Sequence, residues 1–180
     1  VLAVSLGALA AWLGRISEVQ VEEVVLNPNE PQYSMKGING KRFDQEGRLK
    51  ENLSAVDAVQ YPNSADVHLN KPHLSFYRDG SLLYEVGSDK AVYNIQNKKV
   101  VFEQNVVLNK AADAKRLAGI VKTERLNVDT EAQYAHTDSP VTFQYGQSGG
   151  QANGMTYDHK TGLLNFPSKV KATIYDTKNL

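Results

Sequence analysis

The feature that most constrains this fold is a succession of short alternating apolar and polar runs from Tyr33 onward, separated by turn signals. Alternation with a period of two is typical of β-strands that bury one face. The pairs Asp79-Gly80, Asn39-Gly40 and Thr161-Gly162 are of the kind that closes tight hairpins. Strands that recur about every ten residues predict an antiparallel all-β sandwich, barrel or roll.

One pattern recurs within these runs at intervals of roughly 30 residues. A unit of this length cannot bury its apolar face alone, so the copies are expected to stack side by side into an elongated roll with open edges at both ends. In each copy one strand ends, a few residues turn or bulge, and a second strand begins. The copies are Val67-x-Leu69-x-x-Pro72-x-Leu74, Val100-x-Phe102-x-x-Asn105-x-Val107, Ala135-x-Thr137-x-x-Pro140-x-Thr142 and Leu164-x-Phe166-x-x-Lys169-x-Lys171.

The same alternation assigns the faces of the strands. Gln104 falls on the apolar face of its strand, which predicts a bulge after Phe102. Several inward positions carry tyrosine, whose hydroxyl needs a partner when buried, so the interior suits an amphipathic guest. The inward positions are Val67, Leu69, Leu74, Phe76, Leu82, Tyr84, Val86, Ala91, Tyr93, Ile95, Val100, Phe102, Val106, Leu108, Val141, Phe143, Tyr145, Met155, Tyr157, Leu164, Phe166, Val170, Ala172 and Ile174.

The first residues differ from the rest, because VLAVSLGALAAWLG (Val1 to Gly14) carries no charge. A helix of this length covers about 21 Å of the ~30 Å that a bilayer core needs. The sequence begins with valine rather than methionine, and further apolar residues upstream would complete a span. We expect a transmembrane anchor over residues 1–17, a linker over 18–31 and one β-domain over 32–180. The alternatives are a signal peptide cleaved near Ala8-Leu9-Ala10 and a buried helix.

No catalytic or metal-binding motif accompanies these strands. With 20 basic and 20 acidic residues, the charge balance favours neither nucleic acid nor an anionic membrane surface as a partner. Cysteine is absent, which excludes disulfides and thiolate chemistry. The histidines His68, His73, His136 and His159 lack a carboxylate at a suitable spacing, and outward positions indicate solvated side chains. We therefore expect no enzyme, no cofactor and no metal site.

Two stretches are the most distinctive, PQYSMKGINGKRFDQEGRL (Pro31 to Leu49) and PHLSFYRDGSLLYEVGSDKAVYNIQNKKVVFEQNVVL (Pro72 to Leu108). Together with the apolar N-terminus and the repeats, they resemble the LptC family, the inner-membrane-anchored periplasmic proteins of the lipopolysaccharide export bridge. The second stretch is similar to the family's succession of P-x-L-x-x-[FY], a polar turn, A-x-Y and L-x-G-x-V. The chain departs from the family at Gln104, where glycine is common. The resemblance implies an OstA-like β-jellyroll that is open along one side.

The resemblance also implies a function. Lipopolysaccharide would pass from the inner-membrane ABC transporter, bound by the N-terminal edge and transmembrane helix, to the soluble periplasmic bridge protein, bound by β-augmentation at the C-terminal edge. The single-pass protein would hold its β-domain in the periplasm. An edge-pairing adaptor with a closed core and a secreted carbohydrate-active jellyroll are the alternatives. The residues implied to hold acyl chains are Leu69, Leu74, Phe76, Tyr84, Tyr93, Ile95, Phe102, Val106, Phe143, Tyr157 and Phe166, and those implied at the downstream edge are Val170, Ala172, Ile174 and Tyr175.

Overall fold

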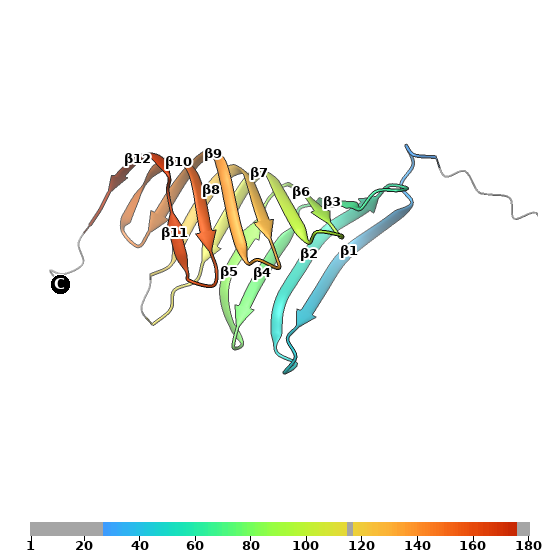
Figure 1. The fold of residues 1–180 in the computed structure, drawn as a ribbon, viewed down its shortest axis with the longest axis horizontal. Helices are drawn as coiled ribbons and strands as arrows, with labels where there is room; N and C mark the ends of the chain where they lie inside the picture. The colour runs from blue at the N-terminus through green and yellow to red at the C-terminus, as the bar shows by residue number, and fades with distance from the viewer. Residues whose placement is uncertain (1–26, 115–116, 176–180) are drawn as a thin grey trace, which may run out of the picture.

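The computed structural model describes residues 27–114 and 117–175, which form β-strands and no helix (Figure 1). All twelve strands belong to one antiparallel sheet, so the prediction of an all-β antiparallel domain is confirmed. Within the described ranges, no helix is long and apolar enough to cross a bilayer. The anchor expected over residues 1–17 lies outside the described residues, and so does most of the linker expected over 18–31.

The strands are of two lengths, and they succeed one another along the long axis of the roll, from β1 and β2 at one end to β10, β11 and β12 at the other (Figure 1). The long strands are β1 (Tyr33–Phe43), β2 (Leu49–Gln60), β7 (Lys99–Lys110), β8 (Gly119–Asp129), β9 (Tyr134–Tyr145) and β10 (Ser148–Asp158). The short strands are β3 (Asp66–Asn70), β4 (His73–Arg78), β5 (Ser81–Gly87), β6 (Lys90–Asn94), β11 (Leu163–Asn165) and β12 (Ser168–Thr173).

The sheet is folded into two layers, and the long strands run through both. One part of β2 pairs with β4 and the other part with β3, while β7 pairs with β6 and then with β5. On the other side of β10, β12 pairs with its first half and β11 with its second. We call the layer that contains β3, β6 and β11 layer A, the layer that contains β4, β5 and β12 layer B, and the line along which the strands change layers the fold line.

The predicted repeat lies on this fold line. Lys71, Gln104 and Lys169 have φ angles of 47°, 65° and 49° there, a left-handed conformation that is uncommon outside glycine. In β10, Gly154 takes the same role with φ of 81°. Each of these residues stands where a strand ends or its register shifts. The sequence repeat therefore marks the positions at which the chain bends from layer A to layer B.

The bulge predicted in β7 is confirmed. The register of β7 against β8 shifts between Glu103 and Val106, and both intervening residues have positive φ. The bulge is held from the neighbouring connection, where the main-chain N–H of Asp89 donates to the Gln104 carbonyl at 2.9 Å. The Asn105 amide donates to the Asp89 carboxylate at 2.6 Å. These bonds satisfy polar groups that the interrupted ladder would otherwise leave unpaired.

The core fills the space between the layers at the centre of the roll. Val86, Phe102, Leu126 and Met155 are fully buried. Most of the positions that alternation assigned to the interior are buried here, which follows from the two-residue period of the strands. The buried ones among the predicted positions are Leu69, Leu74, Phe76, Tyr84, Val86, Ala91, Val100, Phe102, Val106, Leu108, Val141, Met155 and Tyr157.

Three local predictions are wrong. Asn39-Gly40 lies inside β1, and the chain turns instead between Phe43 and Leu49. Ile95 lies in the turn after β6 and is 39% exposed, because the strand ends at Asn94 and alternation does not extend beyond it. Tyr145, Leu164, Val170, Ala172 and Ile174 are exposed as well, because they lie near the C-terminal end of the roll, where no further described strand covers them.

Candidate functional site

A cavity that we call the proximal chamber opens between the layers at the N-terminal end of the roll. Its volume is about 310 Å³. Layer B contributes the β1–β2 hairpin and Leu74 of β4, and layer A contributes Tyr93 of β6 and Val100 of β7. The chamber has an apolar floor and a charged rim. Its lining residues are Gly40, Lys41, Arg42, Glu51, Leu53, Leu74, Tyr93, Lys98, Val100, Thr130 and Glu131.

A second cavity, the distal chamber, opens between the layers toward the C-terminal end, and its volume is also about 310 Å³. Its walls are more apolar than those of the proximal chamber. Phe143 of layer B and Phe166, in the connection between β11 and β12, stack across its end with ring centroids 4.2 Å apart. The lining residues are Leu108, Lys110, Gly119, Ile120, Val121, Phe143, Gln144, Tyr145, Tyr157, Gly162, Leu164 and Phe166.

The two chambers are separated by an aromatic partition formed by Phe76, Tyr84, Tyr157 and His159. Phe76 and Tyr84, on the neighbouring strands β4 and β5, stack with centroids 4.4 Å apart and are almost fully buried. The Tyr84 ring meets Tyr157 of layer A edge-on at 5.5 Å and His159 at 5.2 Å. Burial raises the pKa of the Tyr84 hydroxyl, and the neighbouring Tyr157 raises it further. The partition therefore joins the two layers and interrupts the interior.

A polar contact closes the roll beside the partition. Arg78, at the end of β4, donates from Nη2 to the carbonyl oxygen of His159 at 3.2 Å, and the same Nη2 lies 3.4 Å from His159 Nε2. His159 is only 6% exposed, so the solvated position predicted for it is wrong. Burial and then the charge of Arg78 lower the pKa of His159 to about 4, so the ring is neutral at pH 7.

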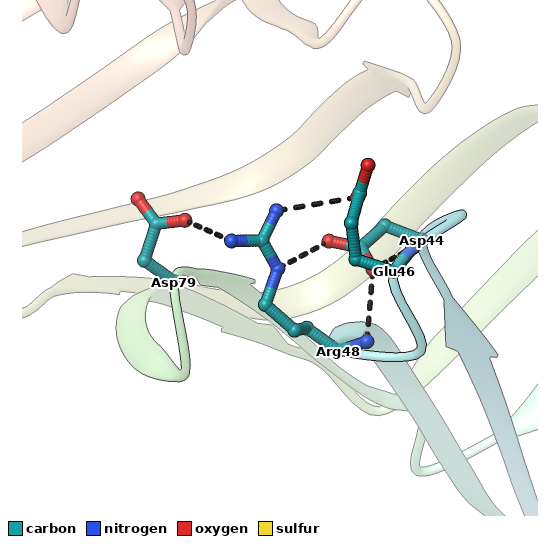
Figure 2. A network of polar contacts seen from close by, with 4 residues as sticks. All are labelled: Asp44, Glu46, Arg48 and Asp79. Atoms are coloured by element: carbon teal, nitrogen blue, oxygen red, sulfur yellow. Dashed lines mark hydrogen bonds and ion pairs between the residues drawn. The ribbon is translucent and has the colours of Figure 1, made fainter.

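Figure 2 shows a polar network outside the proximal chamber, and it includes Asp79, which follows Arg78 in the chain. The guanidinium of Arg48 donates to Asp44 at 2.9 Å, to Asp79 at 2.9 Å and to Glu46 at 3.3 Å. The main-chain N–H of Arg48 also donates to the Asp44 carboxylate at 2.8 Å, and this bond holds the pKa of Asp44 below its ordinary value. The network joins the turn between β1 and β2 to the turn between β4 and β5.

The predicted lipid-site residues fall into four groups. Leu74 and Tyr93 line the proximal chamber, whereas Phe143, Tyr157 and Phe166 line the distal chamber. Ile95 lies outside the interior. The interior is therefore two chambers around a packed centre rather than one continuous groove. The predicted residues in the packed centre are Leu69, Phe76, Tyr84, Phe102 and Val106.

The predicted downstream edge is exposed along its whole length. Val170 and Ala172 belong to β12, whereas Ile174 and Tyr175 follow it. Among the described strands, β12 pairs only with β10, so its second edge is free there. Ala172 lies opposite Gly150, where an added Cβ would come 2.8 Å from the Ala172 Cα and overlap the carbonyl of Lys171. Glycine at 150 is what allows β12 to pack this close.

Sequence reasoning missed the charged residues of the proximal chamber, among them the pair Arg42 and Glu51. Arg42 and Glu51 lie opposite each other on β1 and β2, and the register continues from Glu51 to Phe76 and Tyr84 on the interior face. In RFDQEGRLKE, the two-residue alternation of the strands before and after the turn would have predicted that both residues face the interior. No group of three or more His, Cys, Asp or Glu side chains that could hold a metal occurs in the described part of the chain.

Apolar chambers between two layers, with a free outer edge on the last described strand at each end, define a β-roll that can hold an apolar ligand and extend its sheet into a partner. The family model described as lipopolysaccharide-assembly, LptC-related, matches residues 1–176. The chain belongs to the LptC family. Membership implies a role in lipopolysaccharide transport, as a transport component, in a family whose members are anchored in the inner membrane with a periplasmic domain. Among curated proteins, no sequence matches this chain.

Proposed function

We propose that the interior of this roll binds the acyl chains of lipopolysaccharide and passes the lipid from the inner-membrane ABC transporter to the soluble periplasmic bridge protein. The observation that carries the proposal is the pair of apolar chambers between the layers, one toward each end of the roll. An acyl chain gains about 0.8 kcal/mol for each buried CH₂ group, so apolar walls of this kind favour lipid tails. Family membership supplies the identity of the lipid.

The size of the chambers suggests how much lipid each one holds. Each has a volume of about 310 Å³, at the lower limit of ligand pockets, which span roughly 300–1,000 Å³. A lipid with several acyl chains needs more space than one chamber offers. Full occupancy therefore requires the layers to separate, and the seam beside Arg78 and His159, opposite the fold line, is where the opening would occur.

The free edges account for the two protein partners. The transporter would dock at β1 and through the anchor over residues 1–17, which would make the protein single-pass with its β-domain in the periplasm. The bridge protein would add a strand at β12, in the region of Val170, Ala172, Ile174 and Tyr175. β-Augmentation suits both edges because their main-chain groups are free of partners among the described strands.

Photo-crosslinking tests the lipid site. A photoreactive residue at Tyr93 reports on the proximal chamber, and one at Phe143 reports on the distal chamber. Asn94 is the matched control, because it follows Tyr93 on the same strand and points to the opposite face, where its amide donates to Asp66. Lipopolysaccharide should be labelled from Tyr93 and Phe143 and not from Asn94. Equal labelling from all three positions would contradict a lipid-binding interior.

A second function, that of an adaptor which pairs edges around a closed core, is favoured by one observation. The centre of the roll is packed, with Phe102 and Leu126 fully buried, and the rings of the aromatic partition make contact between the two layers. Under this alternative the chambers would stay empty while both partners still bind. Capture of both partners without any lipid labelling from Tyr93 or Phe143 would favour the adaptor.

A further inference from the structure

The proximal chamber contains an ion pair on the same row of the sheet as Phe76 and Tyr84. Arg42 Nε donates to Glu51 Oε2 at 2.9 Å, and Arg42 Nη2 makes a second, short bond to Oε1 of the same carboxylate. The register continues from Glu51 to Phe76 and Tyr84, so the pair faces the interior. Glu51 is 8% exposed, which is rare for a carboxylate.

Stability of the hairpin does not account for this pair. Removing a carboxylate from water carries a penalty that a single ion pair often fails to offset, and apolar replacements are often neutral or stabilising. The adjacent interior row of the same hairpin carries Gly40 and Leu53, followed by Leu74 of β4. An apolar pair would therefore continue the pattern of the neighbouring row. The presence of charge here points to a ligand.

The geometry leaves the guanidinium able to bind a second anion. A guanidinium has five N–H donors, and Arg42 gives two of them to Glu51. Its other donors make no hydrogen bond to any described residue. The Arg42 side chain is 47% exposed while that of Glu51 is 11% exposed, so the cation is the more accessible partner. The hydrogen bond to Glu51 raises the pKa of Arg42, and Tyr93 and Glu131, which line the chamber from the other side, raise it further.

We propose that Arg42 binds the phosphate group of a phosphorylated glycolipid whose acyl chains occupy the proximal chamber. This rests on the proposed function and adds the recognition of the polar end of the lipid. Arginine suits a phosphate because its planar fork matches two oxyanion oxygens. Glu51 neutralises Arg42 while the chamber is empty, and its competition with the phosphate keeps binding weak enough for the lipid to leave. Among the described residues, the lining of the distal chamber has Lys110 as its one cation, and this ammonium donates to the Ala111 carbonyl at 2.8 Å and lies 3.6 Å from the Asp113 carboxylate.

The test measures binding of three probes to the purified full chain: a phosphorylated glycolipid, the same glycolipid without phosphate, and inorganic phosphate. The wild type should prefer the phosphorylated glycolipid by about tenfold or more, the range expected for charge-assisted hydrogen bonds. Arg42→Gln should abolish this preference and leave binding of the unphosphorylated glycolipid unchanged. Glu51→Gln, which removes the competing charge, should strengthen binding of the phosphorylated form several-fold.

Arg48→Gln is the control, because Arg48 lies on the same hairpin and its ion pairs are outside the chamber (Figure 2). It should behave as the wild type. If Arg42→Gln does not fold, the proposal is tested by whether Glu51→Gln binds the phosphorylated glycolipid more tightly than the wild type does. The proposal is overturned if Arg42→Gln keeps the preference, if Glu51→Gln gives no gain, or if inorganic phosphate binds as tightly as the glycolipid. Failure of both glycolipids to bind any variant would instead overturn the proposed function, and this site with it.

Discussion

Replacing Gly150 by valine should release β12 from β10 while the rest of the roll stays folded. A Cβ at this position would overlap the carbonyl oxygen of Lys171 and come 2.8 Å from the Ala172 Cα. Both are main-chain atoms, so no side-chain rotation can relieve the overlap. The two strands must separate locally, because the Gly150↔Ala172 pair lies between the pairs Gly149↔Thr173 and Gln151↔Lys171.

The pairing of β12 is weak enough for this overlap to detach it. The strand pairs with β10 at Gly149, Gly150, Gln151 and Asn153, and all six of its residues are exposed. Ladder hydrogen bonds contribute about 1 kcal/mol each, or roughly 4 kcal/mol for four. No residue of β12 is buried, so side-chain packing adds little to these bonds. The attached strand is therefore weakly held, and steric overlap should shift the equilibrium toward release.

Limited trypsin digestion followed by mass spectrometry measures the release, because Lys169 and Lys171 lie on β12. The rate of cleavage at these lysines tracks the population of molecules in which β12 is detached. A loss of about 1.4 kcal/mol in the free energy of pairing between β12 and β10 should therefore raise the cleavage rate about tenfold. Gly40→Val is the control, because the nearest atom to a Cβ there is the Leu53 carbonyl oxygen at 3.9 Å. Equal cleavage of Gly150→Val and wild type at Lys169 and Lys171 would refute the reasoning.

Three further outcomes are expected. Tyr84→Ala should lower the free energy of unfolding in urea by about 3–5 kcal/mol, as for other buried aromatic residues, whereas Tyr33→Ala, at a 58% exposed site, should change it little. Because the pKa of His159 is about 4 when folded and 6.5 ordinarily, the unfolded chain takes up the proton first. The free energy of unfolding should therefore fall as the pH is lowered from 6.5 toward 4. Its slope should stay below about 1.4 kcal/mol per pH unit, the limit for uptake of one proton. His159→Gln should reduce this slope. Phe166→Ala removes the ring that stacks on Phe143 across the end of the distal chamber, so it should speed uptake of a fluorescent fatty acid by this chamber. An unchanged rate would show that the stack does not cover the chamber.

The strands and their bends could be predicted from the sequence because both depend on local residues. Alternation placed Phe102, Val106 and Leu108 on the interior face of β7, and all three are buried. The polar interruption at Gln104 predicted the bulge, where the left-handed φ of 65° is found. Such features follow from the two-residue period of a strand and from backbone sterics, which neighbouring residues determine.

The shape of the interior could not be predicted, because it depends on how the two layers meet. Alternation identifies Tyr84 and Tyr93 equally as inward, yet Tyr84 fills the partition while Tyr93 lines a chamber. The difference arises from Tyr157 and His159, which approach Tyr84 from layer A and are more than 70 residues away in the chain. His159 was misjudged for a related reason: it follows the last residue of β10, where alternation no longer indicates direction.

The partition places a requirement on any passage of lipid through this roll. A continuous groove would offer similar sites without a barrier, whereas here the contacts of Tyr84 and the bond from Arg78 to His159 must break before the chambers join. A lipid or a partner can favour the open state only to the extent that it binds that state more tightly than the closed one. The β1–β2 hairpin is suited to transmit such a preference, because it lines the proximal chamber and its turn is bonded through Arg48 to Asp79, the neighbour of Arg78. Binding at the N-terminal edge is therefore the step that we expect to open the partition.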